Sequence, residues 1–237
     1  MTSAIIVAAG KSTRMGPEVD KLFLELNGRP VVAHTWSRFD AAKCIEQIVM
    51  VVREGMQSAF GEMAQIYNFK KPFRVILGGA ERQDSVWNGL VALPPDCEVV
   101  AIQDGARPCT TEELITATVR AAREVGAAVA SQAVNDTIKQ SADGAFIERT
   151  VDRSKLFAVQ TPQTFRVDVI RRALAEVRRQ GLVVTDDTTA CELVGQPVRL
   201  VLCSEPNPKL TRKDDVTYLE HLLKQERRLH SEPPEPN

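Results

Sequence analysis

The sequence has few aromatic residues, few histidines and no long hydrophobic run. Aromatic side chains make up 5% of its 237 residues, and there are 3 histidines. No apolar stretch approaches the roughly 20 residues that a membrane-spanning helix needs. The chain runs almost directly into the short apolar stretch Ala4–Ala9, without a basic leader or a cleavage site. These features predict a cytoplasmic protein that does not associate with a membrane.

The sequence also lacks an excess of charge and any paired pattern of cysteines. Its 30 basic and 31 acidic side chains leave a formal net charge of −1, which gives no sign of nucleic-acid binding. The 5 cysteines are scattered and never have C-x-x-C spacing, so we expect free thiols in a reducing compartment. With 43% hydrophobic residues, the chain is long enough to form a core without disulfides or structural metals.

Short apolar runs alternate with amphipathic stretches through the first half of the chain. The runs rich in β-branched residues are Ile5–Ala8, Ile45–Val52, Phe73–Leu77 and Val99–Ile102. Continuous apolar runs of this length are typical of strands that are buried on both faces of a parallel sheet. Helical patterns lie between them, at Val31–Phe39, Asp84–Leu93 and Thr111–Val125. The alternation predicts an α/β fold with a doubly wound, mostly parallel sheet.

The middle of the chain breaks this rhythm. Residues 135–153 are polar, contain the turn Ala142-Asp143-Gly144 and are flanked by short extended pieces, which predicts a β-hairpin arm projecting from the sheet. Beyond the arm, we expect helices at Val167–Arg179, Thr188–Leu193 and Lys213–Glu226, and a strand at Val198–Cys203. We expect one domain over residues 1–227 and a disordered, proline-rich tail over residues 228–237.

A glycine-containing loop, Ala8–Gly16, follows the first predicted strand. Its small residues allow backbone N–H groups to approach an anion, and Lys11, Arg14 and Lys21 add positive charge. The segment matches neither the P-loop pattern nor the dinucleotide-binding fingerprint. The sequence favours phosphate binding here, and an ordinary strand-to-helix connection remains the alternative.

A second glycine loop, Gly78–Ser85, follows the third predicted strand and leads into a helix. One interpretation is a loop that contacts a base or a ribose. The other is a glycine turn in which Asp84 or Ser85 caps the helix. The residues alone leave both interpretations open.

Asp104 and Arg107 follow the fourth predicted strand. Ligands of an open parallel sheet bind at the carboxyl ends of its strands. A carboxylate there suits a hard cation and a guanidinium suits an anionic substrate, but the two side chains could also form a salt bridge with each other. Lys209 comes shortly after the strand predicted at Val198–Cys203, and its own chemistry does not distinguish it from a solvated lysine.

These motifs are more specific together than any one of them is alone. From about Ser3 to Leu223, the sequence resembles the methylerythritol phosphate cytidylyltransferases of the non-mevalonate isoprenoid pathway. The resemblance rests, in chain order, on AAGKSTRMG with Lys21, GGAERQDSV, DGARP, DTIK, TVDRSKLFAVQTPQTF, TDDT and NPKLT. It implies a nucleotidyltransferase with a Rossmann-like fold that transfers CMP from CTP to 2-C-methyl-D-erythritol 4-phosphate and releases pyrophosphate. It also implies dependence on Mg²⁺ or another divalent cation, and a homodimer.

The resemblance further implies roles for particular residues. The catalytic cations would be Arg14, Lys21 and Lys209. The residues that bind CTP would be Ala8, Ala9, Gly10, Gly79, Ala80 and Ser85. The residues that bind the acceptor substrate would be Asp104, Arg107, Thr137, Arg153 and Thr185, with Asp104 also near the metal. Thr137 and Arg153 lie on the predicted arm, and they would reach the substrate of the neighbouring subunit.

The sequence departs from the family's pattern at a few positions. Gln103 stands where a histidine is frequent, Gly105 where alanine is frequent, and Asp20 and Leu22 flank Lys21 in place of proline and glutamine. Pro208 stands where a β-branched residue is usual. Because proline fixes φ and lacks an N–H group, we expect the path into Lys209 to differ locally.

The implied reaction needs no general base, because the acceptor phosphate is already deprotonated at neutral pH. It needs cations instead, and none of the histidines has a role in it. Two alternatives remain: a cytidylyltransferase that acts on ribitol phosphate, and a non-catalytic nucleotide-binding regulator. The single glycine of the first loop and the run Thr150–Arg153 argue against the first alternative. The presence of Lys21, Asp104 and Lys209 together argues against the second.

Overall fold

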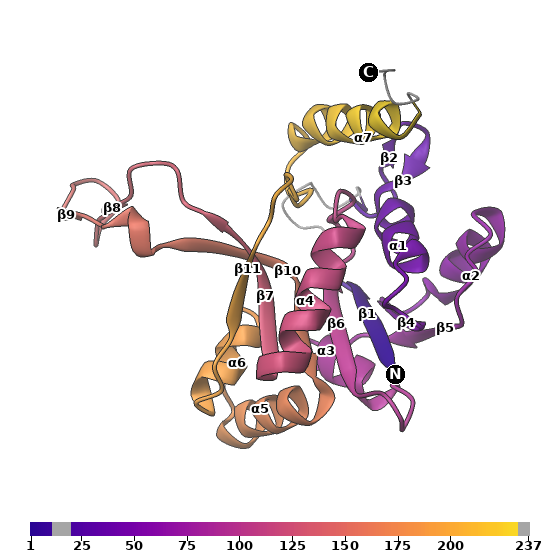
Figure 1. Cartoon of the computed structure of the whole chain (residues 1–237), viewed down its shortest axis with the longest axis horizontal. Helices are drawn as coiled ribbons and strands as arrows, with labels where there is room; N and C mark the ends of the chain where they lie inside the picture. Colours follow the sequence, from indigo (N-terminus) through magenta and orange to yellow (C-terminus); the bar gives the residue numbers. More distant parts are fainter. Residues whose placement is uncertain (11–19, 232–237) are drawn as a thin grey trace, which may run out of the picture.

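A seven-stranded sheet forms the centre of the computed structural model, which describes residues 1–10 and 20–231 (Figure 1). The strand order is β11-β7-β10-β6-β1-β4-β5. Strand β10 is antiparallel to both of its neighbours, and the other four pairings are parallel. The strands are β1 (Thr2–Ala8), β4 (Gln47–Val52), β5 (Phe73–Leu77), β6 (Val99–Asp104), β7 (Ala127–Ala133), β10 (Phe157–Arg166) and β11 (Arg199–Leu202). The predicted doubly wound, mostly parallel sheet is confirmed.

Helices cover both faces of the sheet. They are α1 (Val31–Ala41), α2 (Gln57–Ile66), α3 (Arg82–Val91), α4 (Glu112–Val125), α5 (Val167–Gln180), α6 (Asp187–Leu193) and α7 (Asp215–Ser231). One buried cluster joins Ile6 of β1 to α1, α2, α4 and α7, and a second joins Ile5 of β1 to α3, α5 and α6. Because successive side chains of a strand point to opposite faces, the continuous apolar runs serve both clusters. In the described part of the chain, no helix is long and apolar enough to cross a membrane.

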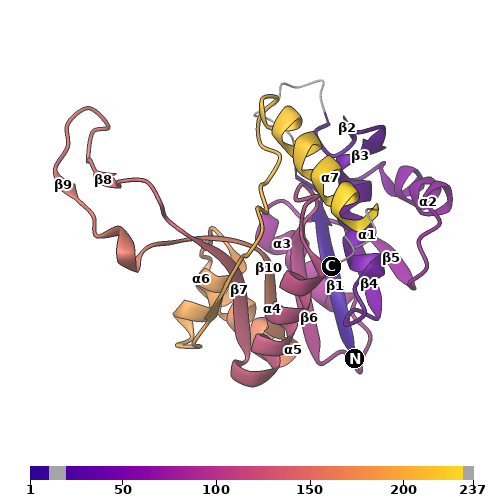
Figure 2. The same cartoon turned by 45° about the horizontal axis from the view of Figure 1, so that its top comes forward.

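The polar middle segment extends away from the sheet as an arm (Figures 1 and 2). It lies between β7 and β10 and carries the two-residue strands β8 (Lys139–Gln140) and β9 (Arg149–Thr150), which pair antiparallel. A 3-10 turn, Arg153–Lys155, leads from the arm into β10. The predicted hairpin is therefore present. A second small hairpin, β2 (Glu25–Leu26) with β3 (Arg29–Pro30), lies near α7.

The sequence analysis was wrong about four elements. It treated the segments flanking the arm as short extended pieces, but β7 and β10 have 7 and 10 residues and lie inside the sheet. It gave no helix at α2, which begins without a side-chain cap at Met56. It ended the last helix at Glu226, whereas α7 continues to Ser231 over residues assigned to a disordered tail. Residues 232–237 of that predicted tail lie outside the described residues.

Candidate active site

The two glycine loops meet at the carboxyl edge of the sheet. Gly78, just after β5, is so close to the end of β1 that an added Cβ would lie 2.4 Å from Ala9 Cβ and 2.8 Å from Ser85 Oγ. Its N–H donates to the carbonyl oxygen of Val52 at 2.9 Å. Glycine at this position lets the two loops pack directly against each other.

The second loop also caps α3. The Glu81 side chain accepts a hydrogen bond from the backbone of Asp84, and the Asp84 side chain accepts one from the backbone N–H of Glu81. Ser85 Oγ accepts from the N–H of Gly79 at 3.1 Å. The N-cap of α3 is thus Glu81, and Asp84 takes part in capping as the third helical residue of a capping box, while the buried Ser85 braces the loop from within. These contacts hold Gly79 and Ala80 at the surface of the loop, where both are exposed.

Asp104, the last residue of β6, is the centre of a cluster of cations. Lys209 Nζ lies 2.7 Å from Asp104 Oδ2, Arg107 Nε lies 3.6 Å from the same oxygen, and Arg82 Nε lies 3.7 Å from Oδ1. The salt bridge between Asp104 and Arg107 that the sequence left open is therefore present, as one of three ion pairs. Burial favours the neutral carboxyl, but the attraction of Lys209, Arg82 and Arg107 outweighs it and lowers the pKa of Asp104 to about 2.

Lys209, one of these cations, and the nearby Lys21 are linked by further backbone contacts. The segment carrying Lys209 is tied to the loop after β6, because Leu210 N–H donates to the carbonyl oxygen of Ala106 at 2.9 Å. Lys21 Nζ donates to the carbonyl oxygen of Leu210 at 3.3 Å, which brings Lys21 beside the same segment. The proline at position 208 therefore does not prevent the Lys209 side chain from reaching Asp104.

A cavity of about 370 Å³ opens between the two glycine loops and Asp104. Eight of the residues proposed from the sequence line it: Ala9, Gly10, Lys21, Gly79, Ala80, Ser85, Asp104 and Lys209. Ala8 does not line it, because its side chain is buried in β1. The cavity joins small residues that expose backbone groups to a wall of cations, which suits a polyanionic nucleotide.

A second cavity, of about 290 Å³, lies on the other side of Asp104. Arg107 and Thr185 line it together with residues of β10, so the structure places both candidates there. Arg82, Asp104 and Lys209 line both cavities. A reactant in one cavity would therefore face a reactant in the other across the same three charged side chains.

The sequence analysis missed Arg82. This arginine begins α3 and pairs with Asp187 at 2.8 Å between Nη1 and Oδ2, while its Nε faces Asp104. Asp187 is 0% exposed. Burial raises the pKa of Asp187, and the attraction of Arg82 offsets this only in part. The GGAERQDSV and TDDT runs contain these two residues, but nothing in the sequence indicates that they pair across 105 positions.

Two other candidates lie on the arm, and a third lies outside the described residues. Thr137 and Arg153 are exposed on the arm, and neither lines the two cavities described above. Arg153 Nη1 donates to the carbonyl oxygen of Asn135 within the arm itself. Arg14 lies outside the described residues, as does Lys11.

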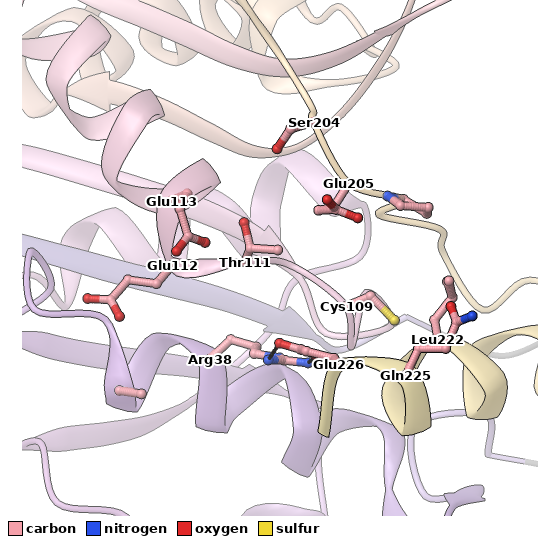
Figure 3. Close-up of a pocket in the computed structure, with 12 residues that line it drawn as sticks. Arg38, Cys109, Thr111, Glu112, Glu113, Ser204, Glu205, Leu222, Gln225 and Glu226 are labelled. Carbon is pink, nitrogen blue, oxygen red and sulfur yellow. Dashed lines mark hydrogen bonds and ion pairs between the residues drawn. The ribbon is translucent and has the colours of Figure 1, made fainter. Parts of the chain in front are cut away.

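A larger cavity, of about 480 Å³, lies between α1, the start of α4 and α7, and residues 204–206 after β11 also line it (Figure 3). The carboxylates of Glu112, Glu113 and Glu205 line it, and Arg38, its lining arginine, is paired with Glu226. Burial raises the pKa of the Cys109 thiol in its wall to about 12, so this cysteine is no nucleophile at neutral pH. An anionic substrate would be repelled here, so this cavity does not suit a nucleotide. The two cavities beside Asp104 are the candidate active site because the residues proposed from the sequence line them.

The donor set beside Asp104 suits a metal that arrives with the substrate. In the part of the chain that the structure describes, no group of three or more His, Cys, Asp or Glu side chains could hold a metal ion. Asp104 offers one ionised carboxylate, which Lys209 contacts in this state. Mg²⁺ in nucleotide-processing enzymes is commonly bound by one or two carboxylates and by substrate phosphate oxygens, so one carboxylate is sufficient.

A doubly wound sheet with glycine loops and a cation cluster at its carboxyl edge defines a nucleotidyltransferase, and comparison with known proteins gives the family. The model of the IspD family, 2-C-methyl-D-erythritol 4-phosphate cytidylyltransferase, matches residues 2–225. A relative of that name from Alkaliphilus oremlandii is 40% identical over 95% of this chain and 96% of its own. One from Dehalococcoides mccartyi is 42% identical over 94% and 96%. The chain belongs to the IspD family.

Solved structures agree with this assignment. The crystal structure titled 4-diphosphocytidyl-2C-methyl-D-erythritol synthase from Anaerococcus prevotii superposes with a TM-score of 0.84 at 28% identity. It covers 94% of this chain and 96% of the other. The 2-C-methyl-D-erythritol 4-phosphate cytidylyltransferase from Thermus thermophilus superposes with a TM-score of 0.76 at 29% identity, covering 94% and 100%. The fold expected from the resemblance is therefore confirmed over nearly the whole chain.

Proposed function

We propose that this chain transfers a cytidylyl group from CTP to 2-C-methyl-D-erythritol 4-phosphate and releases pyrophosphate. Membership of the IspD family supports the choice of substrates. The structural observation that carries the proposal is the pair of cavities that share Arg82, Asp104 and Lys209. CTP would occupy the cavity of the glycine loops, and the acceptor phosphate the cavity of Arg107 and Thr185.

The reaction is an in-line displacement at the α-phosphorus of CTP. A phosphate oxygen of the acceptor forms the new P–O bond while the bond to pyrophosphate breaks, and no proton has to be removed. Both reactants are anions, so the main barrier that the protein must lower is electrostatic. Lys21, Lys209 and Arg14 would offset the repulsion between the reactants and stabilise the charge that develops on the oxygens of the α-phosphate.

The binding roles that we propose combine the family resemblance with the walls of the cavities. The backbone of Ala9 and Gly10, which line the first cavity, would contact the phosphates of CTP, together with the backbone of Ala8 at the end of β1. The loop of Gly79, Ala80 and Ser85 would contact the cytosine and the ribose. Arg107 and Thr185 would bind the acceptor, with Asp104 holding the cations between the two substrates.

A divalent cation, Mg²⁺ in the simplest case, would be held by Asp104 and the CTP phosphates. It would supply further positive charge at the reacting phosphate. For that, Asp104 must be ionised at neutral pH, and its lowered pKa supports this role. Lys209 would turn from Asp104 toward the nucleotide when both ligands are bound.

We further propose a homodimer in which each arm completes the active site of the other subunit. A two-stranded hairpin is marginally stable alone, yet this arm extends from the sheet with Phe146 77% exposed and Ile147 66% exposed near its tip. A partner subunit would cover these apolar side chains, and two-fold symmetry would make the exchange reciprocal. Thr137 and Arg153 would then contact the acceptor phosphate bound to the partner.

The test of the function is pyrophosphate release from CTP with each acceptor in turn. We expect turnover with methylerythritol phosphate and a large loss of kcat/KM when UTP replaces CTP, because a carbonyl in place of the 4-amino group leaves hydrogen-bonding groups unpaired. Turnover with ribitol phosphate instead would favour the related cytidylyltransferase. Nucleotide binding without turnover on either acceptor would indicate a regulator. Equal use of UTP would contradict base reading by Gly79 and Ser85.

A further inference from the structure

Asn207 is a buried amide that joins three segments of the chain beside the active site. It is 3% exposed. Its Nδ2 donates to the carbonyl oxygen of Thr161 on β10 at 2.8 Å, and its Oδ1 accepts from the hydroxyl of Thr110 at 2.9 Å. Its own carbonyl oxygen accepts from Arg107 Nη1 at 2.7 Å. Asparagine therefore uses both ends of its amide and its backbone to link β10, the loop after β6 and the segment that carries Lys209.

These contacts continue into the core. Thr110 is completely buried and accepts a hydrogen bond from Gln103 Nε2 at 2.9 Å, and Gln103 belongs to β6. Thr161 Oγ1 accepts from the backbone N–H of Asp104 at 3.1 Å. A buried amide costs free energy unless its groups are paired, and here one end is paired with β10 and the other with the buried Thr110 in the loop after β6. The contacts place Asn207 at a defined position relative to Asp104.

Lys209 follows Asn207 by two residues, between two fixed points. Asn207 holds the segment on one side, and the hydrogen bond from Leu210 N–H to Ala106 holds it on the other. Pro208 fixes its own φ and favours extended backbone at Asn207, which removes further freedom. Lys209 is thus the one residue between these anchors that carries a charge toward Asp104.

We propose that Asn207 is a positioning residue that aims the Lys209 ammonium at the reacting phosphate. The inference rests on the role proposed above for Lys209, and it assigns a separate, non-reacting residue to the same step. Asn207 itself contacts neither of the two cavities. Its effect on turnover passes through the backbone that it holds.

The first experiment compares three isosteric substitutions of buried polar residues. Asn207→Leu removes both amide contacts. Thr110→Val removes the hydroxyl that donates to Asn207, and with it the contacts of that hydroxyl to Gln103 Nε2 and to the carbonyl oxygen of Arg107. Thr118→Val is the matched control, because Thr118 is also completely buried and its hydroxyl is hydrogen-bonded to Ile115 at 2.9 Å and to Thr164 at 3.0 Å, away from Lys209. All three variants are compared by thermal unfolding, and by kcat and KM at a temperature where each is folded.

We expect Asn207→Leu to lower kcat by roughly 100-fold, because a misplacement of about 1 Å can cost that much, with a smaller change in KM for CTP. Thr110→Val should lower kcat in the same direction by less. Thr118→Val should lower the melting temperature and leave kcat unchanged. If Asn207→Leu does not fold, Thr110→Val carries the comparison. A normal kcat in folded Asn207→Leu or, failing that variant, in Thr110→Val would overturn the proposal.

The second experiment asks whether Asn207 acts through Lys209. In a Lys209→Ala background, Asn207→Leu or Thr110→Val should cause less than a twofold further fall in kcat, because the group that they position is already absent. A further fall as large as in the wild-type background would show that Asn207 acts elsewhere and would overturn the proposal. If Lys209→Ala alone has wild-type turnover, the role of Lys209 itself fails, which is a distinct result.

Discussion

At the carboxyl edge of the sheet, the buried Asp104 lies 2.7 to 3.7 Å from three half-buried cations, which are contributed by three segments of the chain. On the arm, Thr137 and Arg153 are exposed, and the Arg153 guanidinium donates to the arm's own backbone. A single chain therefore forms the nucleotide cavity by itself. Its arm residues are exposed to solvent, and they would contact a substrate only in the active site of a second chain.

The difference follows from burial. Charged side chains are held in a fixed geometry when they form ion pairs with neighbouring segments and water is excluded. Arg82 is held in this way by its ion pair with the buried Asp187. The arm pairs only two residues on each strand, and its side-chain contacts, such as Arg149 to Gln140, are exposed. Such contacts contribute little in water. The predictions below ask how far this contrast extends.

The largest effect is expected at the fixed edge. Replacing Lys209 with Ala should lower kcat by roughly 10²–10³, because it removes a preorganised positive group from the reacting phosphate. Lys21→Ala should have an effect of the same order. Pyrophosphate release measures turnover, and thermal unfolding verifies that each variant is folded. Near-wild-type turnover in either variant would remove that lysine from the mechanism.

The arm is tested by mixing two inactive variants. Lys21→Ala damages the sheet edge, and Arg153→Ala damages the arm. If arms are exchanged, a heterodimer has one site with both defects and one site with neither. A mixture that allows subunit exchange should then recover up to roughly a quarter of wild-type activity, since half of the dimers are mixed and each has one intact site.

The controls for this experiment are each variant alone and a mixture kept from exchanging. Exchange is verified by a size or charge tag on one variant. If exchange occurs and activity does not return, Lys21 and Arg153 serve the same subunit's site, and the contrast between a self-sufficient edge and a borrowed arm is wrong.

The sequence predicted the strands that are rich in bulky aliphatic residues and missed those that contain few of them. Runs such as Ile45–Val52 are buried on both faces and contain little else than aliphatic side chains. Strand β7 is rich in Ala, and strand β10 is rich in Gln and Thr. Each nevertheless has five consecutive buried residues, and the buried polar side chains of β10 are paired by hydrogen bonds. Thr164 of β10, for example, donates to Thr118 of α4 at 3.0 Å. Such pairing is tertiary and leaves no periodic signal.

The same limit applies to the candidate site. The glycine loops and Asp104 could be proposed because each lies beside a strand end. Lys209 was proposed only through the resemblance to a known family. Arg82 and Asn207 lie in the same motifs, but their importance depends on partners far away in the chain: Asp187 for the first and Thr110 with Thr161 for the second. A single sequence shows which residues occur together in a run, and it does not show which runs come into contact.

A smaller effect is expected from the pH dependence of stability at the edge. The pKa of Asp104 is lowered from 3.8 to about 2, so its ion pairs stabilise the fold above about pH 4 and are lost as pH falls through about 2. At 1.36 kcal/mol for each pKa unit, this corresponds to about 2 kcal/mol. Urea unfolding of wild type and Asp104→Asn between about pH 6 and about pH 2.5 measures it, and the difference should shrink toward acid. A constant difference would mean that Asp104 titrates normally.

The smallest effect is expected on the arm, where a pair of arginine substitutions sharpens the contrast. Arg149 donates to Gln140 at 2.8 Å and is exposed. Arg38, at the fixed core, pairs with Glu226 across α1 and α7 and donates to the carbonyl oxygen of Pro108 at 3.1 Å. Arg149→Ala should change the free energy of unfolding by less than about 0.5 kcal/mol, because exposed pairs contribute little.

Arg38→Ala should cost more than Arg149→Ala, because it leaves partly buried acceptors unsatisfied. Chemical unfolding of both variants at one protein concentration makes the comparison, and repeating it at a tenfold lower concentration separates folding from association. If Arg149→Ala destabilises the protein as much as Arg38→Ala at both concentrations, the arm is part of the folded unit of a single chain. The two regions would then differ in exposure alone, and the reason for assigning the arm to a partner's site would be lost.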